Sequence, residues 1–366
     1  MALSTIGTNQ ISNEVFQANR NLIINGEMSV AQRGTSSTTN GYGSVDRWKL
    51  TYGGGGTLTH SQQSLTSGSP YQEGFRSSFR ATVTSASNAA GTYAQLEQRI
   101  EAQNMAQSGW EYTSTSSSLT LSFWAKSSLA GTYYVQFRTV DTTEYYYNKS
   151  FTLSADTWKK ITCTVAGNSN LVINNDNGSG FSVLVVPDYG TTYTGDAEAV
   201  TDAWYARTQT DGYFPNFAQD WHNTGSATFE ITAVQLEVGE VATPFEHEDI
   251  GTTLRKCQRY YVRMNADAAY SMWGAGFAYT STATKINIPF PVEMRTAPSL
   301  GQSANNTLDI FTGGDSPAFT SDAVINNPSS WGTNLTCTVG SITVGYGCVI
   351  MANNSTAAYL EFMAEL

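Results

Sequence analysis

The chain has 366 residues, which is enough for two or three domains with apolar cores of their own. Charged residues make up only 13% of it, against about 25% in an ordinary soluble protein, and the net charge is −11. We therefore expect a surface of neutral polar side chains that recognises partners by hydrogen bonding. We do not expect nucleic-acid binding, because a protein that binds a phosphate backbone needs a basic face.

No stretch reaches the roughly 20 consecutive apolar residues that cross a bilayer, so membrane insertion is not expected. The first residues lack the basic start and apolar run of a secretory signal, which predicts folding in a cytoplasm. The chain has four cysteines without CxxC spacing, Cys163, Cys257, Cys337 and Cys348. We expect them to be reduced and buried, and a Cys337–Cys348 bridge could form only after release into an oxidising medium.

Residues 1–20 show a weak helical pattern that is too short to be stable alone, so we interpret them as a docking arm. From residue 21 to about 250, short alternating segments are separated by Gly, Asn, Ser and Thr, which is typical of an antiparallel β-sandwich. The segment 93–108 fits both a helix and a strand. The strands predicted in this part are 22–24, 119–125, 133–139, 161–165, 181–185 and 229–235.

One segment, 187–223, has no periodic pattern but is rich in aromatic residues, and we call it the aromatic insertion. Sugars stack their apolar faces on such rings, so five of its residues are candidate glycan contacts: Trp204, Tyr205, Tyr213, Phe217 and Trp221. Aromatic rings also serve subunit contacts and internal packing, and both roles stay open as alternatives.

A domain boundary is predicted near 244–251, followed by a short helix at 254–261 that leads into a strand. The remainder alternates again, which predicts a smaller C-terminal β-sandwich over 251–366 with strands at 286–290, 342–346 and 359–362.

Catalytic signals are weak. His60, His222 and His247 lie far apart without metal-ligand spacing, and no nucleophile or nucleotide-binding motif occurs. A glycosidase needs two carboxylates across a cleft, and the candidate pairs are Glu97 with Glu101 and Asp196 with Glu198. The first pair is explained more simply as a charged edge beside Arg99. The sequence therefore favours a protein that is not an enzyme, with a polysaccharide depolymerase as an alternative.

Several motifs, taken together and in this order, resemble a family of bacteriophage tail-fibre or virion-appendage proteins. They lie at 21–34, 45–48, 122–126, 234–239, 243–246 and 257–261, and the ending 359–366 is similar to the last strand of many such fibres. The first domain also resembles carbohydrate-binding modules with a jelly-roll sandwich. The resemblance implies a strand over 94–100 followed by a short helix, and a first segment that pairs near the strand carrying Gln235, Leu236 and Glu237.

Many such modules hold a structural calcium where these two segments meet. The resemblance implies Glu27 and Glu237 as side-chain ligands, with Gly26 and Asp46 nearby, although calcium takes six to eight oxygens. A salt bridge from Glu237 or Asp46 to Arg47 is the simpler alternative.

For function, the resemblance implies a virion protein that attaches a phage to host-surface glycan as a homotrimer. The arm would dock to other phage tail or capsid proteins, and three sites on one stalk would multiply the affinity. The candidate trimer contacts are Trp273, Phe277, Phe290 and Trp331, each of which could instead belong to the core. A capsid decoration protein, head fibre or tail spacer without a receptor role is the alternative.

Overall fold

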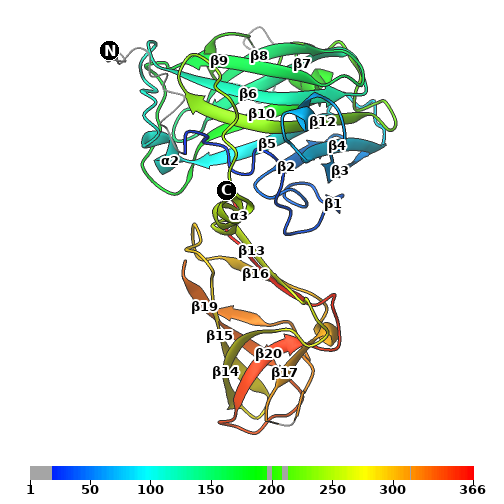
Figure 1. The fold of residues 1–366 in the computed structure, drawn as a ribbon, viewed down its shortest axis with the longest axis vertical. Coiled ribbons are helices and arrows are strands. Elements are labelled where there is room, and N and C mark those ends of the chain that lie inside the picture. The colour runs from blue at the N-terminus through cyan, green and yellow to red at the C-terminus, as the bar shows by residue number, and fades with distance from the viewer. Residues whose placement is uncertain (1–18, 196–199, 208–212, 314) are drawn as a thin grey trace, which may run out of the picture. The chain divides into compact units, whose positions relative to one another are not determined.

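The computed structural model describes residues 19–195, 200–207, 213–313 and 315–366. Residues 1–18, most of the expected docking arm, lie outside the described residues. The chain forms two compact units that divide between Ile250 and Gly251, and antiparallel sheets make up both (Figure 1). The predicted all-β class is confirmed.

The N-terminal unit contains two six-stranded sheets. Sheet A has the order β1 (Ser36–Ser37), β3 (Thr57–Ser64), β4 (Ser77–Ser85), β12 (Thr228–Val238), β6 (Ser118–Ser127) and β9 (Lys159–Ala166). Sheet B has the order β11 (Trp204–Ala206), β8 (Tyr145–Leu153), β7 (Gly131–Thr139), β10 (Ser179–Tyr189), β5 (Tyr93–Glu101) and β2 (Lys49–Gly53). The helical segments described here are α1 (Ser69–Gln72), α2 (Ala102–Ala106) and η3 (Thr191–Tyr193).

The two sheets pack face to face around one apolar core, as a sandwich of the jelly-roll type. Successive side chains of a strand point to opposite faces, so alternate residues of β6 and β7 enter this core. The fully buried side chains from these two strands include Leu119, Leu121, Phe123, Tyr133, Val135 and Phe137. The strands predicted from this alternation in 119–125 and 133–139 are confirmed.

The start of the described chain differs from the prediction. Residues 22–24 form no strand, although they lie against β12: Leu22 N–H donates to Leu236 O at 2.8 Å, and Val234 N–H donates to Gly26 O at 2.9 Å. β12 bulges between Thr232 and Gln235, which interrupts the ladder that a regular strand would need. The strand and helix over 93–108, implied by the resemblance, are confirmed as β5 and α2.

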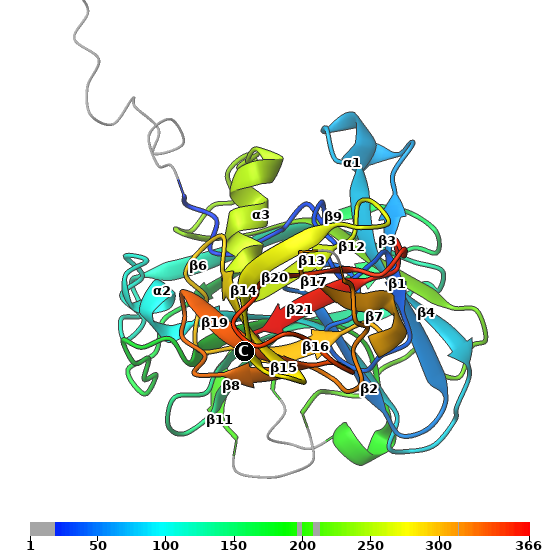
Figure 2. The ribbon, with the colours of Figure 1, turned by 90° about the horizontal axis from the view of Figure 1, so that it is seen from below.

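The C-terminal unit contains α3 (Ile250–Gln258), η4 (Asn305–Thr307) and two sheets (Figures 1 and 2). The three-stranded sheet has the order β13 (Tyr261–Asn265), β21 (Tyr359–Met363) and β16 (Ser299–Gln302). The six-stranded sheet has the order β17 (Leu308–Phe311), β20 (Gly347–Ala352), β14 (Met272–Thr280), β15 (Ala283–Pro289), β19 (Gly332–Thr338) and β18 (Val324–Asn326).

Both C-terminal sheets contribute to a second apolar core, with Leu360 and Phe362 from β21 and Ile286 and Ile288 from β15. The helix predicted to lead into a strand near 254–261 is confirmed as α3 and β13. The strand predicted at 342–346 is wrong, because Gly345 has a φ of +85° and turns the chain there. None of the helices within the described ranges has the length and apolar character needed to cross a membrane.

Candidate functional site

The outer face of sheet B, opposite the core, carries a cleft of about 250 Å³. Four strands of this sheet lie side by side in the order β8, β7, β10 and β5, and their outward residues meet there. We call this site the tyrosine cleft, and it is lined by Tyr93, Gln95, Arg138, Tyr146, Tyr189, Tyr193, Arg207 and Tyr213.

The aromatic insertion covers part of this face. Phe214 is fully buried there against Tyr134, Leu184 and Val186, which point outward from β7 and β10. The rings of Tyr189 and Phe214 lie 4.8 Å apart, and Tyr213 N–H donates to Tyr193 O at 2.8 Å. A small apolar cluster therefore anchors the insertion on sheet B and leaves its tyrosines along the cleft.

Buried amides between the insertion and the sheet are paired. The side-chain amide of Gln136 donates to Asn148 Oδ1 at 2.7 Å, and both residues donate to Tyr213 O. The Asn148 amide also donates to the hydroxyl of Tyr205 at 3.1 Å. Because unpaired buried polar groups are costly, this network holds the insertion in one position.

Arg138 lies at the centre of the cleft. Its guanidinium covers the ring of Tyr146, with Cζ 4.7 Å from the ring centroid. Its Nε–H donates to the side-chain oxygen of Gln136, and its Nη2 is 3.5 Å from Gln95 Oε1. Gln95 also accepts the hydroxyl of Tyr189, so two amide oxygens orient the guanidinium.

Two carboxylates near the cleft, those of Glu97 and Glu144, form ion pairs with cations other than Arg138. Glu97 is buried and lies 3.0 Å from Lys49 Nζ and 2.8 Å from Arg99 Nε. Burial opposes ionisation of Glu97, but these cations hold the pKa of its carboxyl below the usual value. Glu144 pairs with Arg207 at 2.8 Å.

Three tyrosines of the cleft keep their protons, because burial raises the pKa of each hydroxyl. Burial raises the pKa of Tyr189 to about 12, and it also raises the pKa of Tyr93 and of Tyr146 above the usual value. Their hydroxyls are therefore neutral at physiological pH and can donate hydrogen bonds.

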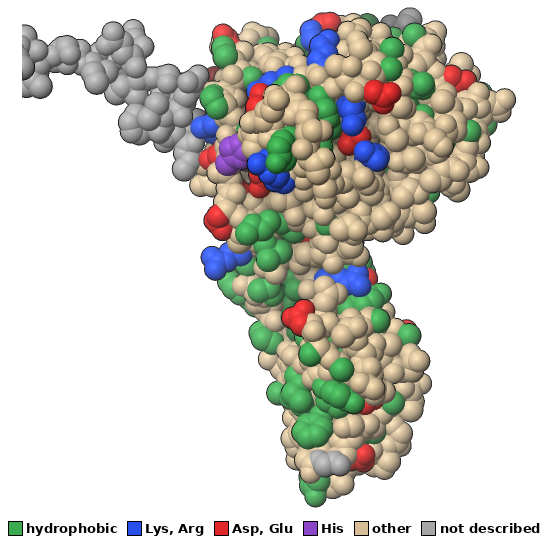
Figure 3. Space-filling model, turned by 45° about the vertical axis from the view of Figure 1, so that its right-hand side comes forward, with side chains coloured by type: hydrophobic (Ala, Val, Ile, Leu, Met, Phe, Trp, Pro, Cys, Tyr) green, Lys and Arg blue, Asp and Glu red, His purple; other side chains and the backbone are tan. Residues whose placement is uncertain are grey.

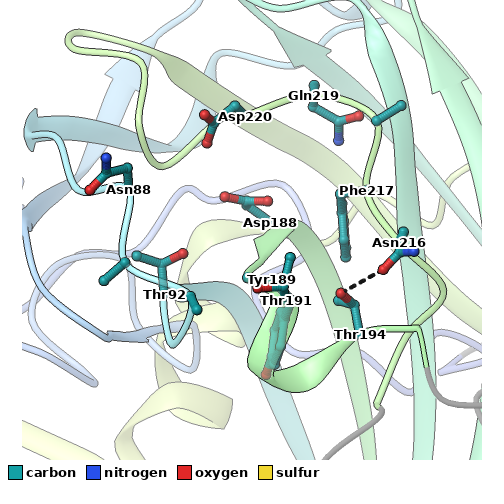
Figure 4. A pocket seen from close by; sticks show the side chains of 14 residues that line it. Asn88, Thr92, Asp188, Tyr189, Thr191, Thr194, Asn216, Phe217, Gln219 and Asp220 are labelled. Carbon is teal, nitrogen blue, oxygen red and sulfur yellow. Dashed lines mark hydrogen bonds between the residues drawn. The ribbon is translucent and has the colours of Figure 1, made fainter.

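A second, more polar pocket of about 500 Å³ shares Tyr189 with the tyrosine cleft, and we call it the Asp188 pocket (Figure 4). Asp188 is 4% exposed, and its Oδ2 accepts the backbone N–H of His222 at 3.1 Å. Burial, together with the nearby charge of Asp220, raises the pKa of Asp188 to about 6. Asn88, Thr92, Asn216 and Gln219 add hydrogen-bonding groups around it.

The five predicted glycan contacts do not form one site. Tyr213 lines the tyrosine cleft, and Phe217 lines the Asp188 pocket. The prediction for Trp221 is wrong, because its side chain is 0% exposed and belongs to the sandwich core. Trp204 packs against the same core and donates to Ala166 O at 2.8 Å, and Tyr205 donates to Tyr213 O at 2.9 Å.

Residues outside the insertion were missed. Tyr93 and Gln95 come from β5, Arg138 from β7 and Tyr146 from β8. In the sequence, each of these polar or aromatic residues alternates along its strand with residues of the core. Such alternation indicates that they lie on the outward face of the strand. That signal does not show that these strands are neighbours.

The four residues predicted as trimer contacts differ in their exposure. Phe290 is 8% exposed, and its ring lies 4.9 Å from that of Phe362, so it belongs to the C-terminal core and the prediction for it is wrong. Trp273 is partly buried against that core. Phe277 and Trp331 are exposed at 50% and 65%, and apolar side chains gather on the face of this unit seen in Figure 3.

The residues implied for calcium do not fit a cation site. Glu237 accepts hydrogen bonds from Thr243 N–H at 2.9 Å and its hydroxyl at 2.6 Å, and from the amide of Gln235 at 2.9 Å. Glu27 faces His247 instead, at 3.7 Å. Across the described ranges, no group of three or more His, Cys, Asp or Glu side chains is placed to hold a metal.

The alternative salt bridge from Glu237 to Arg47 is wrong, because the ion-pair partner of Glu237 is Arg20. Glu237 lies 3.7 Å from Arg20, and Asp46 lies 3.9 Å from Arg33. Asp46 additionally accepts the backbone N–H of Gln32 at 3.0 Å. These carboxylates hold the start of the described chain in place.

The predicted catalytic pairs find no support in the described residues. Glu97 is engaged in ion pairs, and Glu101 is fully buried and accepts the amide of Gln103 at 2.5 Å. Asp196 and Glu198 lie outside the described residues.

No family model matches this chain, and no curated protein does so. Solved structures that match include a domain of tailspike protein 4 from bacteriophage CBA120, at 13% identity and a TM-score of 0.33 over 60% of this chain and 22% of that one. A putative sugar binding protein from Bacteroides thetaiotaomicron matches at 13% identity and a TM-score of 0.35, over 60% of this chain and 100% of that one. A family 11 carbohydrate-binding module from Clostridium thermocellum, in complex with a mixed-linked tetrasaccharide, matches at 12% identity and a TM-score of 0.29, over 57% and 98%. All three TM-scores are below 0.5, so these likenesses carry no argument about function.

Proposed function

We propose that this chain is the receptor-binding part of a bacteriophage tail fibre or another virion appendage, and that its tyrosine cleft holds a sugar of a host-surface glycan. The observation that carries the proposal is the convergence of five tyrosines with amide and guanidinium groups on one sheet face. Tyrosine rings offer apolar faces to sugar C–H groups, and neutral hydroxyls and amides pair with sugar hydroxyls.

Tyr193 is the ring best placed to contact such a sugar. It lies on η3 and is half-buried, with its ring 5.9 Å from each of the rings of Tyr93, Tyr189 and Tyr213. Within the described part of the chain, the Tyr193 hydroxyl forms no hydrogen bond with another residue. The hydroxyl is therefore available to a ligand.

The virion role rests on the resemblance of the motifs between residues 21 and 261 to phage fibre proteins. In this proposal the protein assembles in the host cytoplasm and becomes part of the virion. Residues 1–20 dock to other tail or capsid proteins. A surface with only 13% charged residues fits this setting, because it limits non-specific adhesion to charged debris.

In this proposal the protein acts as a homotrimer, and two further copies of the chain cover the exposed apolar side chains of the C-terminal unit. Monomeric proteins rarely leave large apolar patches exposed, and here Phe277, Tyr279, Tyr346 and Trp331 are each at least half exposed. Three linked sites would raise the affinity for a dense glycan well above that of one site.

A polysaccharide depolymerase is the second candidate, and the Asp188 pocket favours it. A carboxyl with a pKa of about 6 beside a second acidic residue has the property of a general acid. In that case purified protein releases reducing ends from host polysaccharide, and Asp188→Asn abolishes the release. Our proposal expects no product.

The test uses the full chain, purified, against virions and host cells. We expect it to compete with virions for attachment, and we expect Tyr193→Ala to weaken its cell binding about 10-fold with little change in melting temperature. Tyr71→Ala is the matched control, because it removes an exposed ring on α1. No competition at high concentration would contradict the receptor role and favour a capsid decoration or tail spacer protein.

A further inference from the structure

Among the described residues, the charged side chains around the tyrosine cleft include more cations than carboxylates, in a chain whose net charge is −11. The linked charged groups around it include the cations Lys49, Arg99, Arg138 and Arg207 and the carboxylates Glu97 and Glu144. These six side chains carry two more positive than negative charges. The charge around the cleft is therefore opposite in sign to the net charge of the chain.

Arg138 accounts for much of this excess. Lys49 and Arg99 pair with Glu97, and Arg207 pairs with Glu144. Among the described residues, no carboxylate lies within salt-bridge distance of Arg138. Its guanidinium contacts only neutral groups in this part of the chain, which are the side-chain oxygens of Gln136 and Gln95 and the hydroxyl of Tyr189.

The position of Arg138 matches that of a ligand-binding group. Its partners in the ladders are Tyr146 on β8 and Ser182 on β10, so it stands in the middle of sheet B with its side chain on the outer face. Its stacking on the Tyr146 ring and its hydrogen bonds to two glutamines fix the plane of the guanidinium. A fixed guanidinium presents two parallel N–H donors, which suit carboxylate and phosphate oxygens.

We propose that the glycan held in the tyrosine cleft bears an anionic substituent, a carboxylate or a phosphate, and that Arg138 is the residue that binds it. This inference rests on the proposed glycan-binding function and adds the class of sugar. The cleft then supplies the positive charge for the substituent, and the tyrosine rings supply the stacking surface for the sugar ring.

The neighbouring Asp188 pocket fits the uncharged part of such a ligand. Its carboxylates accept hydrogen bonds from sugar hydroxyls, and Asn88 and Asn216 provide further polar groups (Figure 4). Because Tyr189 borders both sites, a glycan of more than one sugar can place its anionic unit against Arg138 and a neutral unit beside Asp188.

The test is a glycan array that carries neutral, carboxylated and phosphorylated oligosaccharides, probed with the full chain and with Arg138→Gln. We expect the wild-type protein to bind acidic glycans, and we expect Arg138→Gln to weaken this binding about 10-fold to 100-fold. Carboxyl-reduced copies of the bound glycans should lose binding if the substituent is a carboxylate, and phosphatase treatment should have that effect if it is a phosphate.

The matched control is Arg76→Gln. Arg76 also stacks on a tyrosine, with Cζ 4.1 Å from the ring centroid of Tyr71, but it lies between α1 and β4, away from the cleft. This variant should bind as the wild type does.

Thermal denaturation will show whether Arg138→Gln is folded. If it is not, two further measurements still test the proposal. Arg138→Lys keeps the charge and removes the two-pronged donor, so it should bind acidic glycans more weakly than the wild type does. Raising NaCl from about 50 mM to about 500 mM should also weaken binding, because salt screens the attraction between an acidic glycan and the cations of the cleft.

Failure of this inference can be told apart from failure of the proposed function. If the protein binds neutral glycans equally well, Tyr193→Ala weakens that binding and Arg138→Gln does not, the anionic class is overturned and glycan binding stands. If no glycan binds, or if Tyr193→Ala has no effect, the proposed function itself is overturned.

Discussion

The indole Nε1–H of Trp221 donates a hydrogen bond to the backbone carbonyl of Thr228, at 3.2 Å. The ring is 0% exposed inside the sandwich core, so Trp221→Ala leaves a cavity, whereas the Thr228 carbonyl keeps the backbone N–H of Ser128 as a donor. We expect a loss of about 3–5 kcal/mol in the free energy of unfolding, measured by urea denaturation. Tyr71→Ala should change it by less than about 0.5 kcal/mol. A Trp221→Ala variant with unchanged stability would place the ring outside the core.

Asp188→Asn should stabilise the protein near neutral pH. The folded-state pKa of about 6 lies above the usual value of 3.8, so the folded state binds this proton more tightly and the charged form is unfavourable in it. The charged Asp188 therefore destabilises the folded state above pH 6, and this destabilisation decreases as the pH falls from 6 to about 4. The variant should gain at most about 3 kcal/mol at pH 7.5.

Melting temperatures of Asp188→Asn and the wild type, measured from pH 4 to pH 8, check this expectation. The gap between them should be constant above pH 6 and should narrow as the pH falls from 6 to 4, because the folded state takes up the proton near pH 6 and the unfolded state only near pH 3.8. Asp220→Asn is the control, since Asp220 is exposed. A gap that is the same at all pH values would show that burial of the charge is not the cause.

The cysteines should resist thiol reagents in the folded protein. None of the four forms a disulfide and all are buried, and burial raises the pKa of Cys163 and of Cys337 to about 12. The reactive thiolate is then scarce at pH 8. We expect negligible labelling by a chromogenic disulfide reagent under native conditions and labelling of all four in guanidinium. Fast labelling of the native protein would show that these thiols are accessible.

Phe277→Ser should lower the oligomeric state if the exposed face of the C-terminal unit joins copies of the chain. Phe277 is 50% exposed and pairs across the sheet with Lys285 and Gly347, so the folded unit does not need its ring. Analytical ultracentrifugation should show trimers for the wild type and smaller species for the variant. Lys285→Ser is the control for a change on the same face. A wild type that sediments as a monomer would contradict the trimer.

Much of the fold follows from local patterns. Alternation of apolar residues over 119–125 and 133–139 predicts strands because successive side chains point to opposite faces, and the same alternation identifies Leu121 and Phe137 as core residues. The pattern fails where the backbone is interrupted: 22–24 meets the bulge of β12, and 342–346 contains the turn at Gly345.

The composition of the aromatic insertion is visible in the sequence, but the roles of its rings are not. Tyr213 and Trp221 lie eight residues apart on the same segment, and one borders the cleft whereas the other is sealed in the core. Both residue types suit either role, and which one they take depends on where the chain crosses sheet B.

The sequence alone determined the all-β class, the weakly charged surface and most of the strands, because each depends on composition or on a period of two residues. The tertiary structure decided the site. Tyr93, Arg138 and Tyr189 lie far apart in the chain and meet because β5, β10 and β7 are neighbours in sheet B. Strand order depends on long-range packing, and no local pattern encodes it.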